Sequence, residues 1–499
     1  MKVLQAMTWV LLAALAVPGS GGPPAAAPDP EIAAINTEVS AERIAGHIKK
    51  LVSFHTRHTL SDPNDPERGI GAARRWIKQE MESYIPASGG RLQVEFDSFI
   101  AEPSSAVSTA PGAGADRPAA DAAQTTRPQG DRPQGRPQGA GGGSRIPKAT
   151  ELVNVVATLP GTDVQAGRVF VVGGHYDSIP RGIMDATAAA PGANDDASGT
   201  AVVLECARVL SQRTFPATLV FIAFVGEEQG LVGARHWAEA AKQKGLRVTM
   251  LNNDIVGGNI GGPQPNTYVR VFSEGVPAIE TPEESRARQA GGGEVDYPSR
   301  QLARYVEEIS SRYLPSFPAR MVWRRDRYGR GGDHTPFNEK GFPAVRFAEA
   351  YEDFTRQHAE VREENGQRFG DLPEFVSPEY IANVARVNAM TLASLALAPP
   401  PPENVRFVTE RGANNTVVSW DALSGVNYEI VWRDTAAPRW EDSRVAGAVN
   451  RYTFADLSKD NYFFGVRAVS EKGHPSLVVF PKPPARRPPG EGAAAPPKK

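Results

Sequence analysis

Apolar residues recur with two different spacings along the first four-fifths of the chain. Between residues 39 and 54, apolar side chains such as Ile44 and Ile48 lie three or four positions apart, which is the spacing of one face of an α-helix. A second helix is predicted over residues 71–84, and residues 91–100 alternate apolar and polar side chains as a strand does. The pattern therefore predicts two helices and a strand over residues 39–100.

From residue 152 onward, β-rich apolar runs alternate with segments of helical spacing. The apolar runs cover residues 152–159, 168–173, 217–225 and 247–253, and the helical segments between them cover residues 200–211 and 231–244. Further strands near residues 268–272 and 344–347 and helices near 299–313 and 378–397 follow. This alternation predicts an α/β domain over residues 38–398, with a mostly parallel mixed sheet sandwiched by helices.

The spacing changes again after the proline-rich linker that begins at Pro399. Short alternating strands are predicted over residues 405–408, 416–420, 428–432 and 462–469, with turn residues between them. Short strands at this spacing are typical of a small all-β sandwich, which we place at residues 402–481.

Three other segments do not carry either pattern. Residues 101–148 are rich in alanine, glycine and proline and repeat Arg-Pro-Gln-Gly three times, so they bury too little apolar surface to order themselves. We expect a disordered insertion there, a linker over residues 21–37 and a disordered tail over residues 482–499.

The first residues have the organisation of a secretory signal. Lys2 precedes an apolar stretch over residues 7–17, and Pro18 and Gly19 follow it. We therefore expect a signal peptide at residues 1–20 and a secreted or periplasmic protein, with an uncleaved anchor as the alternative. The stretch is short for a membrane span, and no later segment is expected to span a membrane.

Composition and charge narrow the function classes. The chain has 55 Lys and Arg against 57 Asp and Glu, and no basic run suits a phosphate backbone, so nucleic acid is not expected as a partner. Its single cysteine, Cys206, excludes an intramolecular disulfide and a cysteine-rich metal site. Nothing in the sequence indicates the oligomeric state.

Polar residues with metal-binding chemistry follow the predicted parallel strands. His175 and Asp177 follow one strand, Glu227 and Glu228 follow the next, and Asp254 follows a third. The carboxyl ends of such strands are where open α/β sheets build their sites. Imidazole and carboxylate groups suit Zn²⁺, a pair of ions needs a carboxylate between them, and a further carboxylate is needed to accept a proton from water.

The motifs themselves resemble the co-catalytic di-zinc peptidase family, which includes bacterial leucine aminopeptidase, plasma glutamate carboxypeptidase and the glutaminyl cyclases. They are His175-Tyr176-Asp177-Ser178, the Pro191-to-Gly199 loop with Asp195, Gly226-Glu227-Glu228-Gln229-Gly230, Asn253-Asp254 and Asp333-His334-Thr335-Pro336-Phe337. The resemblance implies the zinc exopeptidase fold and two zinc ions per chain. Their ligands would be His175 and Asp254 on one ion, Glu228 and His334 on the other, and Asp195 bridging both.

The resemblance also implies catalytic roles and a substrate class. Glu227 would be the general base, Asp177 would support His175, and the substrates would be peptides cleaved at a chain end. An aminopeptidase is the favoured form, while carboxypeptidase or dipeptidase specificity stays open. Residues 402–481 resemble a fibronectin type III domain, for example in Trp420 and Tyr428.

Two other functions remain as alternatives. A glutaminyl-cyclase-like acyltransferase shares the fold but uses one zinc, and a non-catalytic binding protein would be expected to have lost ligands. Histidines outside the motifs, His358 among them, are interpreted as ordinary structural residues. Arg324, Arg325 and Arg327 precede His334 and could line the substrate pocket, although a solvated surface run is the simpler interpretation.

Overall fold

The computed structural model describes residues 28–103, 145–163, 167–262, 264–290, 296–408, 415–455 and 457–482. The predicted signal peptide and most of the predicted insertion and tail lie outside these residues, so these expectations stay predictions. Over the described ranges, no helix is long and apolar enough to cross a bilayer.

Helices come first in the described part of the chain. They are α1 (Pro30–Glu38), α2 (Ala41–Val52) and α3 (Gly69–Glu82), followed by a short 3₁₀ turn at Pro86–Ser88. The linker expected over residues 21–37 therefore gives way to helix at Pro30. Asp29 caps this helix by accepting a hydrogen bond from the Glu31 amide, and Ile32 and Ile35 are fully buried on the side that packs against the last helix of the domain.

One large mixed sheet forms the centre of the first domain. Its strands are β1 (Gln93–Ala101), β2 (Thr150–Leu159), β3 (Arg168–His175), β4 (Thr218–Phe224), β5 (Arg247–Asn253), β6 (Val269–Ser273), β7 (Ala319–Val322) and β8 (Ala344–Glu349). They lie in the order β1-β2-β4-β3-β5-β8-β6-β7. The central strands β4, β3, β5 and β8 are parallel, whereas β1, β2 and β6 each have an antiparallel neighbour.

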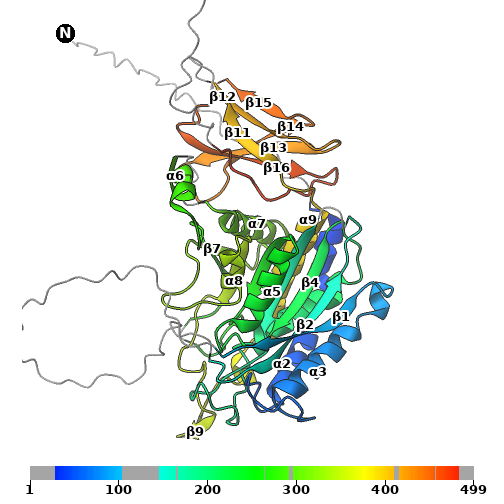
Figure 1. The fold of residues 1–499 in the computed structure, drawn as a ribbon, viewed down its shortest axis with the longest axis vertical. Helices are drawn as coiled ribbons and strands as arrows, with labels where there is room; N and C mark the ends of the chain where they lie inside the picture. The colour runs from blue at the N-terminus through cyan, green and yellow to red at the C-terminus, as the bar shows by residue number, and fades with distance from the viewer. Residues whose placement is uncertain are drawn as a thin grey trace, which may run out of the picture.

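Helices cover both faces of this sheet (Figure 1). The described helices that follow β3 are α4 (Ala197–Leu210), α5 (Val232–Gln243), α6 (Pro282–Ala290), α7 (Pro298–Tyr313), α8 (His334–Glu339) and α9 (Pro378–Leu397). Alternate residues of β3 point to opposite faces: Phe170 and Val172 join the core under α4 and α9, and Val169 and Val171 join the core under α5 and α8. The predicted fold class of this domain is confirmed.

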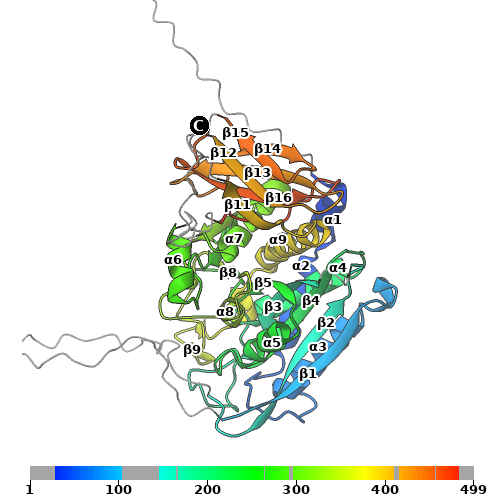
Figure 2. The same ribbon diagram turned by 45° about the horizontal axis from the view of Figure 1, so that its top comes forward.

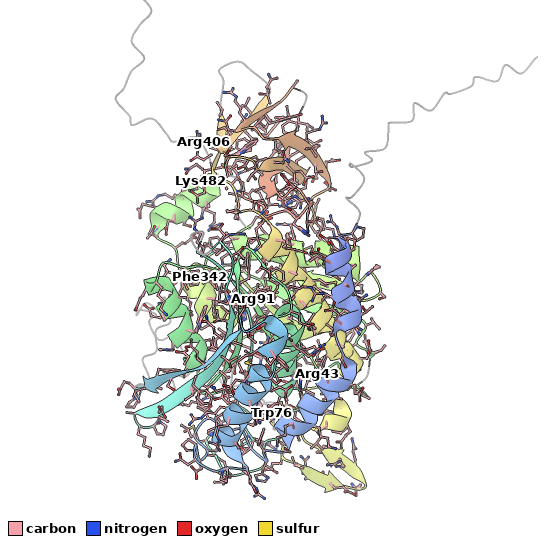
Figure 3. The ribbon with its side chains drawn as sticks, turned by 90° about the vertical axis from the view of Figure 1, so that its right-hand side faces the viewer. Arg43, Trp76, Arg91, Phe342, Arg406 and Lys482 are labelled. Atoms are coloured by element: carbon pink, nitrogen blue, oxygen red, sulfur yellow. The ribbon has the colours of Figure 1, made fainter. Side chains whose placement is uncertain are left out.

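The C-terminal domain is a sandwich of two small sheets. The strands are β11 (Glu403–Val408), β12 (Thr416–Asp421), β13 (Asn427–Asp434), β14 (Asp442–Gly447), β15 (Arg451–Phe454) and β16 (Tyr462–Val469), arranged as β11-β12-β15 and β14-β13-β16. Trp420, Ile430 and Phe464 are buried between the sheets. Lys482, at the end of the described chain, lies beside Arg406 of β11 (Figure 3). The all-β part of the fold class is also confirmed.

Buried charges join the two domains. The Asp296 carboxylate accepts hydrogen bonds from Arg304 of α7, at 2.7 Å, and from Arg433 of β13, and all three side chains are at most 5% exposed. At the amino end of β3, Arg168 donates to the carbonyl of Ala398, where the C-terminal domain begins. The C-terminal domain is thus packed at the amino ends of the parallel strands, and their carboxyl ends lie farther from it (Figure 2).

Beyond β8, the chain forms a long loop before α9. It contains a small hairpin of β9 (Arg362–Glu364) and β10 (Gln367–Phe369) and a 3₁₀ turn at Pro373–Phe375. This loop starts at the carboxyl end of a parallel strand, so it lies at the edge of the sheet where the sequence places its candidate site.

Candidate active site

His175 is the last residue of β3, and its backbone is fixed against α4. A Cβ on Gly174 would lie 2.7 Å from the carbonyl carbon of Gly199. The strand and the helix are therefore too close here for a side chain at position 174. The His175 amide donates to the Asp196 carboxylate at 3.1 Å, and the Thr200 hydroxyl donates to the His175 carbonyl at 2.8 Å. These bonds leave the imidazole projecting from the carboxyl edge of the sheet.

The loop before α4 presents Asp195 to this imidazole. Asp196 caps α4, accepting from the Gly199 amide at 2.9 Å, and the peptide bond between Asp195 and Asp196 is cis. The Asp371 carboxylate accepts from the amides of Asn194 and Asp195, both at 2.8 Å. Burial raises the pKa of Asp371 to about 7. The hydrogen bond from its backbone amide to Asp371 therefore fixes the position of Asp195, and the Asp195 carboxylate remains available to the site.

A single buried carboxylate, Asp177, organises the turn after β4. It accepts hydrogen bonds from the amides of Glu227 and Glu228, both at 3.2 Å, and from the Thr59 hydroxyl at 3.0 Å. Asp177 also orients His175, because Nδ1 of the imidazole lies 3.1 Å from the Asp177 carbonyl oxygen and 3.5 Å from its carboxylate. The turn that carries both glutamates is thus tied to the strand that carries the histidine.

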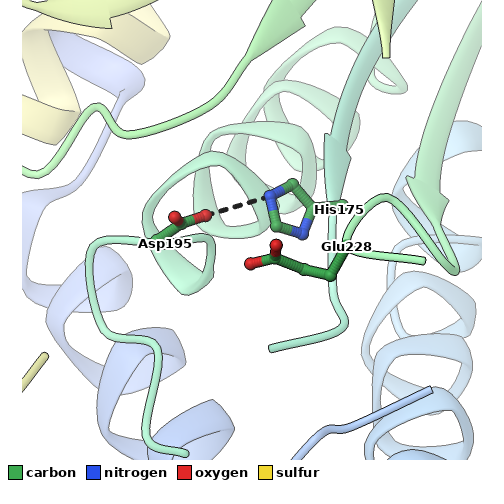
Figure 4. A group of neighbouring side chains, drawn as sticks. All are labelled: His175, Asp195 and Glu228. Carbon is green, nitrogen blue, oxygen red and sulfur yellow. Dashed lines mark ion pairs between the residues drawn. The ribbon is translucent and has the colours of Figure 1, made fainter. Parts of the chain in front are cut away.

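The side chains converge at the carboxyl edge of the sheet (Figure 4). Nε2 of His175 lies 3.1 Å from Oδ1 of Asp195 and 3.8 Å from Oδ1 of Asp254. One ligand atom each from His175, Asp195 and Glu228 lie within 4.8 Å of one another. Asp254 is also paired with Arg346, at 2.9 Å. The structure therefore brings together four of the five residues that the resemblance implied as metal ligands.

A second histidine completes this group, and it is His358. Its Nε2 lies 2.7 Å from Oε1 of Glu228 and 3.1 Å from Oδ2 of Asp195. Burial opposes the charged imidazolium, but the Glu228 and Asp195 carboxylates raise the pKa of His358 well above its usual range. Asp195 therefore faces a histidine with each of its two oxygens.

Several carboxyl groups are buried close together in the site. Burial raises the pKa of Asp196, Glu227 and Asp333 well above the usual range, and neighbouring carboxylates add to each shift. Nε2 of His175 is buried and has no well-aligned hydrogen-bond acceptor among the described residues. Converging carboxylates and imidazole nitrogens of this kind suit a divalent cation of borderline softness.

Comparison with known proteins identifies the family. Residues 154–370 match peptidase family M28, and residues 400–482 match the fibronectin type III domain. Over 463 residues the chain is 41% identical to a probable zinc metalloprotease of Leptosphaeria maculans, across 92% of this chain and 98% of that protein. The chain belongs to peptidase family M28.

Two further proteins are similar to this M28 peptidase. A probable zinc metalloprotease of Pyricularia oryzae is 40% identical over 469 residues, which is 91% of this chain and 85% of that protein. The solved LapA aminopeptidase of Legionella pneumophila is similar in fold, with 18% identity, a TM-score of 0.47 and coverage of 73% of this chain and 74% of that chain. The predicted resemblance and the predicted enzyme class, a metallopeptidase that acts on peptides, are confirmed.

The structure places His334 of this M28 peptidase apart from the converging group. It opens α8, and its Nε2 lies 2.9 Å from the carbonyl oxygen of Arg325. Among the described residues, the acidic group within 4.0 Å of its imidazole nitrogens is Asp326, at 3.6 Å. Burial lowers the pKa of His334. The M28 peptidase thus presents His358, not His334, to the carboxylates of Asp195 and Glu228.

Sequence reasoning missed His358 because no recognisable motif surrounds it. The Asp333-His334-Thr335-Pro336-Phe337 string drew the assignment to His334 instead. One signal was available, since His358 lies in the loop that follows the predicted strand at residues 344–347. That loop leaves the same edge of the sheet at which His175 ends its strand and from which the turn with Glu228 departs.

Proposed function

We propose that this M28 peptidase is an exported di-zinc exopeptidase that removes amino-terminal residues from peptides. One observation supports a pair of ions most directly, and it is the position of Asp195. Its Oδ1 lies 3.1 Å from Nε2 of His175 and its Oδ2 lies 3.1 Å from Nε2 of His358. A carboxylate with one histidine at each oxygen has the arrangement of a ligand that bridges two metal ions.

The proposed ligand sets follow from these distances. His175 and Asp254 would hold one zinc, Glu228 and His358 would hold the other, and Asp195 would bridge them. His358 thereby takes the role that the resemblance implied for His334. The carboxylates of Asp254 and Glu228 lie near different histidines, at 3.8 Å from His175 and 2.7 Å from His358, so each ion would have an imidazole and a carboxylate of its own.

The roles of the remaining residues follow from what they contact. Zinc bound here would polarise the scissile carbonyl and lower the pKa of a water molecule. Glu227 would accept the proton of that water and pass it to the leaving amine. Burial, together with the neighbouring Glu228 carboxylate, raises the pKa of Glu227. Asp177 is a positioning residue, because it holds both the Glu227 amide and Nδ1 of His175.

Cleavage at the amino end is proposed from the resemblance of the motifs to bacterial leucine aminopeptidase. Beyond the proposed ligands, Glu227, Asp196 and Asp333 lie buried close to the same site, and burial favours the neutral form of each carboxyl group. Export is proposed on the sequence of residues 1–20 alone, with a secreted or periplasmic location.

Metal analysis combined with a peptide series tests the proposal. The purified protein is expected to contain two zinc ions, to lose hydrolysis on chelation and to regain it with zinc. It is expected to cleave a peptide with a free amine and not the same peptide with an acetylated amine. A stoichiometry of one with full activity would favour the glutaminyl-cyclase-like alternative, and cleavage only of peptides with a free carboxyl end would reassign the enzyme as a carboxypeptidase.

A further inference from the structure

The loop between β7 and α8 brings a run of arginines toward the site, and most of them are engaged elsewhere. The Arg324 guanidinium stacks on the Tyr328 ring, 3.5 Å from its centre. Arg325 lines a separate pocket with Glu274 and Trp323, and its backbone carbonyl lies 2.9 Å from Nε2 of His334. Arg327 pairs with Glu352 at 2.7 Å and with Asp326 at 3.1 Å. These three arginines therefore have neighbours other than the proposed metal ligands.

Arg330, further along the same loop, is held only weakly. Its guanidinium lies 3.5 Å from Oε1 of Gln357 and 3.8 Å from Oε2 of Glu352. Glu352 already has closer partners, since Arg270 and Arg327 lie 2.5 and 2.7 Å from its carboxylate. Arg330 is thus a third cation beside one carboxylate, and its side chain is 28% exposed.

The position of Arg330 places this surplus charge beside the proposed metal ligands. Gln357, its hydrogen-bond acceptor, immediately precedes His358. Two residues along the loop, a Cβ on Gly332 would lie 3.2 Å from Oδ2 of Asp254. Burial alone would lower the pKa of Arg330, but Glu352 and the carboxylates of the site raise it.

Bound zinc would change the electrostatic surroundings of the Arg330 guanidinium. The carboxylates that attract it would then be neutralised by the ions, and Glu352 would remain committed to two other arginines. A planar guanidinium with free donors next to a peptide-binding site is suited to a carboxylate, which it can hold through two parallel hydrogen bonds.

We propose that Arg330 binds a carboxylate of the peptide substrate close to the scissile bond. This inference rests on the proposed function. The carboxylate is either the free carboxyl end of a very short peptide or an acidic side chain next to the cleaved residue. The enzyme therefore prefers dipeptides or peptides with Asp or Glu after the first residue over neutral, amidated peptides of the same length.

Arg330→Gln tests this preference on three substrates: a neutral dipeptide, the same dipeptide amidated at its carboxyl end, and an amidated dipeptide with Glu in second position. Loss of a hydrogen-bonded charge pair is expected to raise KM roughly 10- to 100-fold. This rise should appear for the substrates that carry a carboxylate and not for the neutral amide, with kcat little changed. The wild-type preference for the free acid or for the Glu-containing amide identifies which carboxylate is bound.

Arg324→Gln is the matched control, because the same loop carries it and its guanidinium rests on Tyr328. This control should keep the wild-type ratio of free acid to amide, and Arg330→Lys should recover part of it. A ratio that does not change in Arg330→Gln, or an equal loss on all three substrates, overturns the role of Arg330. A wild type that lacks zinc and hydrolyses none of the three peptides overturns the proposed function instead.

Discussion

Replacement of His358 by alanine should remove one zinc ion, whereas replacement of His334 should not. His358→Ala deletes the nitrogen that lies 2.7 Å from Glu228 and 3.1 Å from Asp195. Zinc sites with four protein ligands bind with roughly 10–16 kcal/mol, or about 2.5–4 kcal/mol per ligand. Loss of one ligand should thus weaken binding of the second ion by roughly 10²- to 10³-fold.

His334→Ala should affect stability instead. Its imidazole is fully buried and hydrogen-bonded to the Arg325 carbonyl at 2.9 Å. Alanine leaves that carbonyl without its partner, which costs about 1–3 kcal/mol of the free energy of unfolding, and it also leaves a cavity. A lower melting temperature with an unchanged zinc content is the expected result.

Zinc content per chain, measured after dialysis against a zinc buffer of fixed free concentration, separates the two variants. The wild type and His334→Ala should retain two ions and His358→Ala about one. His236→Ala serves as a histidine control, because that ring stacks on Phe99 on another part of the molecule. The reasoning fails if His334→Ala loses an ion while His358→Ala keeps both, and the family motif would then be the better guide.

Three further predictions concern the base, the insertion and the domain junction. Glu227→Gln should lower kcat by roughly 10²- to 10⁴-fold at unchanged zinc content. Glu228→Gln should instead lose zinc and regain activity with excess metal. Normal turnover by Glu227→Gln in a steady-state assay would exclude Glu227 as the base. Deletion of residues 105–144 should leave small-peptide hydrolysis nearly unchanged, provided that Arg145, which donates to the Glu228 carbonyl, is kept. Arg433→Met should lower the free energy of unfolding in a denaturant titration by about 3–5 kcal/mol without changing kcat, and a change of less than 1 kcal/mol would show that the buried pair contributes little.

The parallel centre of the sheet could be predicted from sequence because its strands are buried on both faces. Strands of this kind are continuous apolar runs, as in Val169–Val172, and their bounds follow directly from composition. α1 was missed for the opposite reason. Its composition is that of a linker. The helix is stabilised by packing against α9, which buries Ile32 and Ile35. The short strands β7 and β15 are likewise stabilised by pairing with neighbouring strands, β6 and β12 respectively.

The site was predictable where its residues directly follow those strands. His175, Glu228 and Asp254 lie at or just beyond strand ends, so the order of the strands brings them together. His358 is 130 residues from Glu228 along the chain, in a loop with no periodic pattern. Its backbone φ of 54° lies in the left-handed region, which neither propensity nor motif would predict. Only the path of that loop in three dimensions could choose between the two histidines.

The placement of the C-terminal domain at the amino ends of the parallel strands has a practical consequence for how the enzyme can be attached. Arg168 and Ala398 join at that edge, and the residues of the proposed catalytic centre leave the opposite edge. An enzyme immobilised on a bead or a surface through its C-terminal domain will therefore have its catalytic loops directed away from the support. Peptides will reach those loops from free solution, and immobilised and dissolved enzyme should show the same KM.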